Sequence, residues 1–79
     1  MENFNENEFV SISRIDGSNF RLCNWEGLTL ENDKKIITGI VKYNRPVFKN
    51  RVYIDRKIGI LRDNEKNITW FIESKIKLN

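Results

Sequence analysis

The sequence lacks the residues on which much protein chemistry depends. It contains no histidine and a single cysteine, Cys23, among 79 residues. Without histidine there is no imidazole to act as a general base or to bind zinc, and one cysteine cannot form a disulfide within the chain. The four glycines are isolated, so no phosphate-binding loop is present. The sequence therefore predicts no catalytic residue, no metal site and no cofactor, and Cys23 is expected to be a buried, unreactive thiol.

Two of the better helix formers and long apolar runs are also missing. The chain has no alanine and no glutamine, whereas asparagine and isoleucine each occur eleven times. No apolar run approaches the length of a membrane-spanning helix, and residues 1–7 do not resemble a secretory signal. We expect a cytoplasmic protein without membrane contact. The composition is typical of an AT-rich genome, which leaves two hypotheses open: a phage or other mobile element, or an ordinary AT-rich bacterium.

Alternation of apolar and polar residues predicts strands along most of the chain. It is clearest at the carboxyl end, where residues 57–62 and 68–78 are predicted to form a hairpin. Within it Trp70 is expected in the core, beside Ile68 and Ile72. Phe71 falls on the opposite parity, which makes it either a surface aromatic or a sign that both faces are covered.

A second hairpin is predicted near the amino end, with residues 9–15 and 20–25 joined at Asp16-Gly17, because Gly accepts the positive φ of a tight turn. Between the hairpins, residues 36–43 read as a strand. We expect the sequence Asn44-Arg45-Pro46 to end it, since Pro cannot donate to a ladder. Residues 47–55 then form another strand.

These elements predict a single all-β domain over residues 1–79, with residues 1–8 as a polar, acidic N-terminal arm. Five to six short strands joined by tight turns indicate a small antiparallel barrel or a strongly bent sheet. At this size the usual barrel types are SH3-like and OB-like, and the sequence does not choose between them.

Charge is divided between the two halves of the chain. Residues 1–33 hold seven acids against two bases, a net charge of −5, whereas residues 34–79 hold twelve bases against four acids, a net charge of +8. Within the basic half, residues 42–57 contain six bases, three aromatics and one acid. Bases neutralise phosphates, and aromatic rings offer surfaces on which nucleobases stack.

This segment supplies the candidate binding residues. On a strand starting at Val47, parity places Lys49, Arg51 and Tyr53 together on one face. If Phe48, Val52 and Ile54 on the other face point to the core, the first three residues point to solvent. The full candidate set is Lys42, Tyr43, Arg45, Lys49, Arg51, Tyr53, Arg56 and Lys57. The competing interpretation is a solvated strand face, because basic residues also keep sheets soluble and block edge pairing.

Three hypotheses for function follow. The first is a non-enzymatic module, such as a phage or mobile-element inhibitor or accessory protein, that docks on a larger host protein or nucleoprotein complex. The alternative is direct binding of single-stranded RNA or DNA through residues 42–57. A homo-oligomer in which acidic and basic halves meet is the third. Docking ranks slightly first because the net charge of +3 is moderate.

Overall fold

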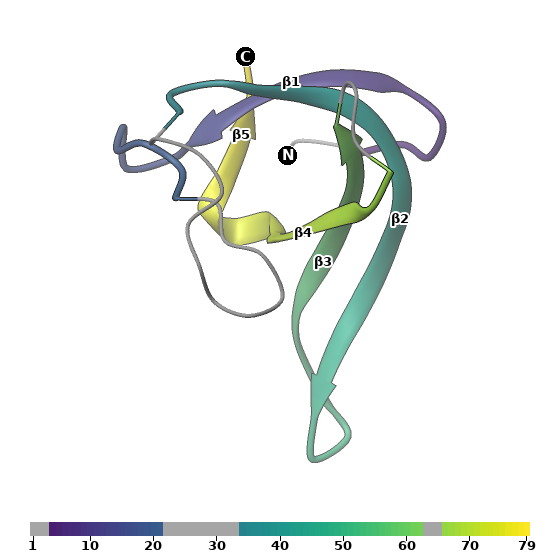
Figure 1. The fold of residues 1–79 in the computed structure, drawn as a ribbon. Coiled ribbons are helices and arrows are strands. Elements are labelled where there is room, and N and C mark those ends of the chain that lie inside the picture. Colours follow the sequence, from purple (N-terminus) through teal and green to yellow (C-terminus); the bar gives the residue numbers. More distant parts are fainter. Residues whose placement is uncertain (1–3, 22–33, 63–65) are drawn as a thin grey trace.

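The computed structural model describes residues 4–21, 34–62 and 66–79. Within these ranges the chain forms five strands, β1 (Phe9–Arg14), β2 (Ile37–Lys49), β3 (Val52–Arg62), β4 (Ile68–Ile72) and β5 (Ile76–Leu78), with a 3₁₀ helix η1 (Glu73–Lys75) before β5. All pairs are antiparallel, and the strand order is β4-β3-β2-β1-β5. The prediction of an all-β domain with a strongly bent sheet is confirmed (Figure 1).

The sheet curls but does not close into a barrel. Its two edge strands, β4 and β5, are consecutive in the chain and are joined by η1. β4 pairs with β3, whereas β5 pairs with β1, through partners such as Ser13 and Lys77. The prediction of one continuous strand over residues 68–78 is therefore wrong, because η1 turns the chain from one edge of the sheet to the other.

The β3–β4 half of the predicted carboxyl-terminal hairpin is confirmed, with Lys57 opposite Ile72 and Leu61 opposite Ile68. At the amino end β1 is also confirmed, and Gly17 adopts a φ of +78° in the turn that follows it. Among the described residues β1 pairs with β2 and β5, and Phe20, the first residue of the predicted return strand, forms a bridge to Lys34. Residues 22–25 lie outside the described ranges.

The long β2–β3 hairpin departs most from the prediction. β2 does not end at Asn44-Arg45-Pro46, because Pro46 lies within the ladder opposite Arg56. The last β1 partner on β2 is Ile40, and the Val41 backbone still bonds to Asn7 and Glu8. Pro46 lies beyond these bonds, on a part of the β2 edge where a residue without an N–H is tolerated. The hairpin consequently extends past the rest of the sheet and projects from the body (Figure 1).

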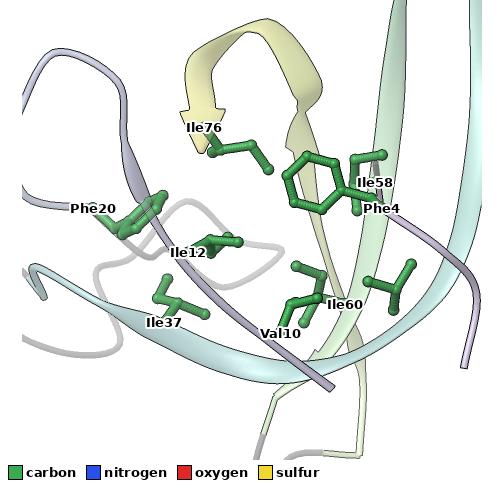
Figure 2. Packing of buried hydrophobic residues seen from close by; sticks show 9 residues of the cluster. Phe4, Val10, Ile12, Phe20, Ile37, Ile58, Ile60 and Ile76 are labelled. Carbon is green, nitrogen blue, oxygen red and sulfur yellow. The ribbon is translucent and has the colours of Figure 1, made fainter. Parts of the chain in front are cut away.

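The core lies inside the curve of the sheet, on its inner face. It consists of nine buried residues: Phe4, Val10, Ile12, Phe20, Ile37, Val41, Ile58, Ile60 and Ile76. Figure 2 shows Phe4 reaching this cluster from the N-terminal segment and lying between Ile58 and Ile76. Its ring is only 1% exposed, so the part of the predicted N-terminal arm that the structure describes is anchored in the core.

Candidate functional site

A bulge in β2 decides which side chains face away from the core. Val41 pairs with Ile60, and both are fully buried, but Tyr43 pairs with Gly59, which leaves Lys42 as an extra residue. An extra residue reverses the alternation of faces along the strand. Tyr43 and Arg45 therefore share the outer face with Gly59 and Lys57, whereas Asn44 shares the inner face with Ile58.

On the outer face, two aromatic rings stack across the sheet. Gly59 of β3 pairs with Tyr43 on one side and with Trp70 on the other. The rings of Tyr43 and Trp70 have centroids 5.5 Å apart and planes inclined by 20°, which is an offset-stacked geometry. Trp70 is 45% exposed, so the prediction that it belongs to the core is wrong. Phe71 instead packs against the core, with its ring edge-to-face against Phe20 at 5.4 Å.

Gly59 makes room for this stack. A Cβ atom at this position would lie 3.1 Å from Cη2 and Cζ3 of Trp70 and 2.9 Å from Cγ2 of Ile68. Real Cβ contacts are rarely this short, so any larger residue would push the indole off the sheet. A glycine in the middle strand thus lets the two flanking aromatic rings meet above it.

Two cations flank the aromatic pair. The Arg45 guanidinium carbon lies 4.5 Å from the Tyr43 ring centroid, and the Lys57 Nζ lies 5.0 Å from the Trp70 centroid. Both distances are in the cation–π range. Arg45 and Lys57 are also directly opposite each other in the ladder, an arrangement of like charges that destabilises a sheet. We call these four residues, Tyr43, Arg45, Lys57 and Trp70, the outer cluster.

Three other candidates lie farther out, on the projecting end of the hairpin. This segment, residues 46–54, is called the arm below. Lys49 pairs with Val52, and Asn50 and Arg51 form the two-residue turn between them, with φ values of 52° and 67°. Tyr53 faces Phe48 across the ladder, with ring centroids 6.1 Å apart.

The arm has no core to cover it. Phe48, Val52, Tyr53 and Ile54 are between 52% and 62% exposed. The prediction that Phe48, Val52 and Ile54 are buried is therefore wrong, whereas the predicted exposure of Lys49, Arg51 and Tyr53 is confirmed. The prediction of one strand over residues 47–55 is also wrong, because β2 ends at Lys49 and β3 begins at Val52. This turn places Phe48 on the same face as Tyr53 and Lys49 on the same face as Val52, which is not the grouping that parity gave.

Arg56 is separated from the other candidates. Its Nε donates to Oδ1 of Asn44 at 2.6 Å, and Nη2 donates to the Asn44 carbonyl oxygen at 3.2 Å. Asn44 Nδ2 in turn donates to the carbonyl oxygen of Phe4 at 2.8 Å. This chain of hydrogen bonds ties the base of the arm to the buried N-terminal segment, so Arg56 stabilises the fold. Lys42, the bulged residue, is exposed beside the outer cluster.

The cations of this surface are not neutralised by the described acids. Arg14 pairs with Asp16 at 3.2 Å, and Lys42, Arg45 and Lys57 have no ion pair to an acid among the described residues. Asp55, the only acid in residues 42–57, accepts hydrogen bonds from Ser74 Oγ at 2.6 Å and from the Arg56 amide at 2.7 Å. These hydrogen bonds, that from Ser74 foremost, lower the pKa of Asp55 below its ordinary value.

Other functional classes receive no support from the described residues. In those ranges no three His, Cys, Asp or Glu side chains lie close enough together to hold a metal ion. The described chain also contains no helix with the length and apolar character needed to cross a membrane. Cys23, which is predicted to be a buried and unreactive thiol, falls outside the described ranges.

Sequence reasoning missed Trp70 as a site residue. Its apolar neighbours Ile68 and Ile72 suggested a buried face, but all three lie outside, with Ile72 40% exposed. The sequence signal for an outward-facing ring was Gly59, because a glycine within a strand leaves space over the backbone. In the structure Trp70 is its partner on β4 and its ring occupies that space. Comparison with protein families, curated proteins and solved structures found no match. Function is therefore argued from the site itself.

Proposed function

We propose that this protein is a non-enzymatic binding module whose outer cluster binds single-stranded RNA or DNA. The observation that carries this proposal is the stack of the half-buried Tyr43 ring and the exposed Trp70 ring, with Arg45 and Lys57 at its sides. Aromatic faces bind nucleobases of any sequence, and adjacent cations neutralise the phosphates between them. A cluster of like charges, kept opposite each other at a cost in stability, is consistent with an anionic ligand.

The local distribution of charge favours nucleic acid over the docking hypothesis that ranks first on sequence alone. That ranking rests on a moderate net charge of +3. A ligand responds to the surface it contacts, and here Lys42, Arg45 and Lys57 are exposed on one region of the sheet without a carboxylate partner among the described residues. The charge of this surface is therefore a better indication of the ligand than the net charge of the chain.

Fluorescence anisotropy of labelled oligo-dT and oligo-U at 50 and 150 mM salt tests the proposal. We expect dissociation constants that rise with salt, because each neutralised phosphate contributes a slope of about −0.7 for single strands. Lys57→Glu should weaken binding at both salt concentrations. Trp70→Ala should weaken it by about 1–3 kcal/mol, the usual value of one stacked base, whereas Trp70→Phe should retain most of the affinity.

The matched control is Lys77→Glu, the same change of charge at an exposed position on β5, which lies beside β1 at the other end of the strand order. It should leave the affinity close to that of the wild type. Absence of binding at 50 mM salt would contradict the proposal, and so would equal losses for Lys57→Glu and Lys77→Glu. Circular dichroism of each variant verifies that it is folded.

Docking on a protein is the second candidate, favoured by the exposed apolar residues of the arm. Trp, Tyr and Arg are also the residues that most often dominate the binding energy of protein interfaces. If no oligonucleotide binds, the outer cluster and arm are left for an acidic protein surface. The phage or mobile-element origin and the cytoplasmic location stay predictions.

The strand order supports a proposal on the type of fold. A four-strand meander β1-β2-β3-β4, followed by a 3₁₀ helix and a fifth strand that pairs with β1, is similar to the SH3-like arrangement. An OB-like barrel is less compatible, because β3 and β4 here are direct hairpin neighbours. We propose an opened SH3-like barrel with a lengthened β2–β3 hairpin.

A further inference from the structure

The turn at the tip of the arm places an arginine where a glycine would be more stable. A two-residue turn with positive φ at both positions strongly prefers Asn-Gly. Asn50 suits the first position, but the second holds Arg51 at a φ of 67°, where a side chain costs stability and glycine does not. The arginine at the tip therefore lowers stability for a reason that lies outside the folding of the hairpin.

Both edges of the arm are blocked against pairing with another strand. On β2, Pro46 offers no N–H for a ladder. On β3, Ile54 is an extra residue between Asp55, which pairs with Val47, and Tyr53, which pairs with Phe48, and such a bulge disrupts an edge. The amide of Arg56 is also occupied, because it donates to the Asp55 side chain. The arm therefore acts through its side chains.

Those side chains repeat the chemistry of the outer cluster. Lys49 lies on the same face of β2 as Tyr43 and Arg45, and both Lys49 and Arg51 are exposed cations. Phe48 and Tyr53 form an exposed aromatic pair on the opposite face of the hairpin. Arg45 belongs to the outer cluster and Lys49 to the arm, and these two positions are separated by four residues of one strand, roughly 13 Å. A polynucleotide several residues long would reach both groups.

We propose that the arm is the second half of the nucleic-acid site, so that a single strand runs along the β2–β3 hairpin from the outer cluster to Arg51. This inference rests on the proposed function and adds the direction and extent of the bound strand. Arg51 is present at the turn because its guanidinium contacts a phosphate there, at the expense of the stability that glycine would provide.

The test combines thermal unfolding with the salt dependence of labelled dT12 binding. Arg51→Gly should stabilise the protein, because glycine adopts the left-handed conformation at this position without the cost that a Cβ imposes. In a domain of this size the Tm should rise by roughly 4–8 °C. The same variant should reduce the salt slope by about 0.7, and Arg51→Gly combined with Lys49→Gln by about 1.4. Arg51→Lys keeps both charge and backbone strain, and it should resemble the wild type in Tm and slope.

Asn50→Gly is the matched control for flexibility of the turn, since it frees the neighbouring backbone position without removing charge, and its slope should equal that of the wild type. If the double variant keeps the wild-type slope while Lys57→Glu still weakens binding, the arm lies outside the site and only this inference fails. If wild-type protein does not bind dT12 at low salt, the proposed function fails and this inference fails with it.

Discussion

The inner and outer faces of β2, β3 and β4 are made from alternate residues of the same strands but have opposite characters. Inside, Val41, Ile58 and Ile60 have no exposed surface. Outside, the corresponding rows hold two aromatic rings and two cations that touch one another and solvent. Substitutions on the inner face should therefore change the free energy of unfolding, whereas those on the outer face should change affinity.

The largest effect should come from Phe4, which tests whether the N-terminal segment belongs to the inner face. Phe4→Ala should reduce the free energy of unfolding by about 3–5 kcal/mol, because it removes a fully buried ring and leaves a cavity. Phe9→Ala is the control, since that ring is 62% exposed, and its effect should stay within about 0.5 kcal/mol. Urea denaturation measures both, and similar losses would contradict the comparison.

The next largest effects on stability should come from alanine substitutions at two glycines, Gly39 on the inner face and Gly59 on the outer face. A Cβ at Gly39, which is buried on the inner face, would lie 2.4 Å from the Leu61 carbonyl oxygen, so backbone has to move. The three atoms nearest to a Cβ at Gly59 belong to side chains, Cγ2 of Ile68 at 2.9 Å and two ring carbons of Trp70 at 3.1 Å. We expect Gly39→Ala to cost about 3 kcal/mol and Gly59→Ala about 1 kcal/mol, with only the second shifting Trp70 fluorescence in a Trp25→Phe background.

If Gly59→Ala leaves both the fluorescence of Trp70 and the affinity for oligonucleotides unchanged, the glycine does not support the stack. If Gly59→Ala lowers the free energy of unfolding more than Gly39→Ala does, a clash with backbone is not more costly here than a clash with side chains, and the comparison is wrong.

The smallest effect should appear in the pH dependence of stability at the base of the arm. Because the hydrogen bond from Ser74 lowers the pKa of Asp55, its contribution is present above the ordinary Asp pKa of about 4 and is lost as the pH falls through the lowered value. Ser74→Ala should return the Asp55 pKa toward its ordinary value and flatten the acid dependence. NMR titration of the Asp55 carboxyl carbon measures this, and an unchanged titration would exclude the Ser74 contact.

Local patterning predicted some of the fold well. The β3–β4 pairing followed from alternation and a polar turn, and the positive φ of Gly17 followed from Asp-Gly. The errors at Pro46 and Trp70 have a common origin, because each depends on which element lies next to the residue in the folded sheet. Parity gives two faces for a strand but does not say which one meets the core, and the bulge at Lys42 reverses the answer within β2.

The candidate site was also predictable only in part from the sequence. Its basic and aromatic composition was visible in residues 42–57, and so was the exposure of Lys49, Arg51 and Tyr53. Its actual grouping was not, because Trp70 joins from a strand beyond that segment while Arg56 turns away to Asn44.

By itself, the sequence determined the all-β class, the turn at Asp16-Gly17 and the concentration of positive charge between residues 42 and 57, because these depend on neighbours in the chain. Only the tertiary structure decided that the sheet stays open, that Phe4 fills the core and that Tyr43, Arg45, Lys57 and Trp70 meet. Those outcomes depend on the register between strands and on one extra residue at position 42, and register is set by packing across the sheet.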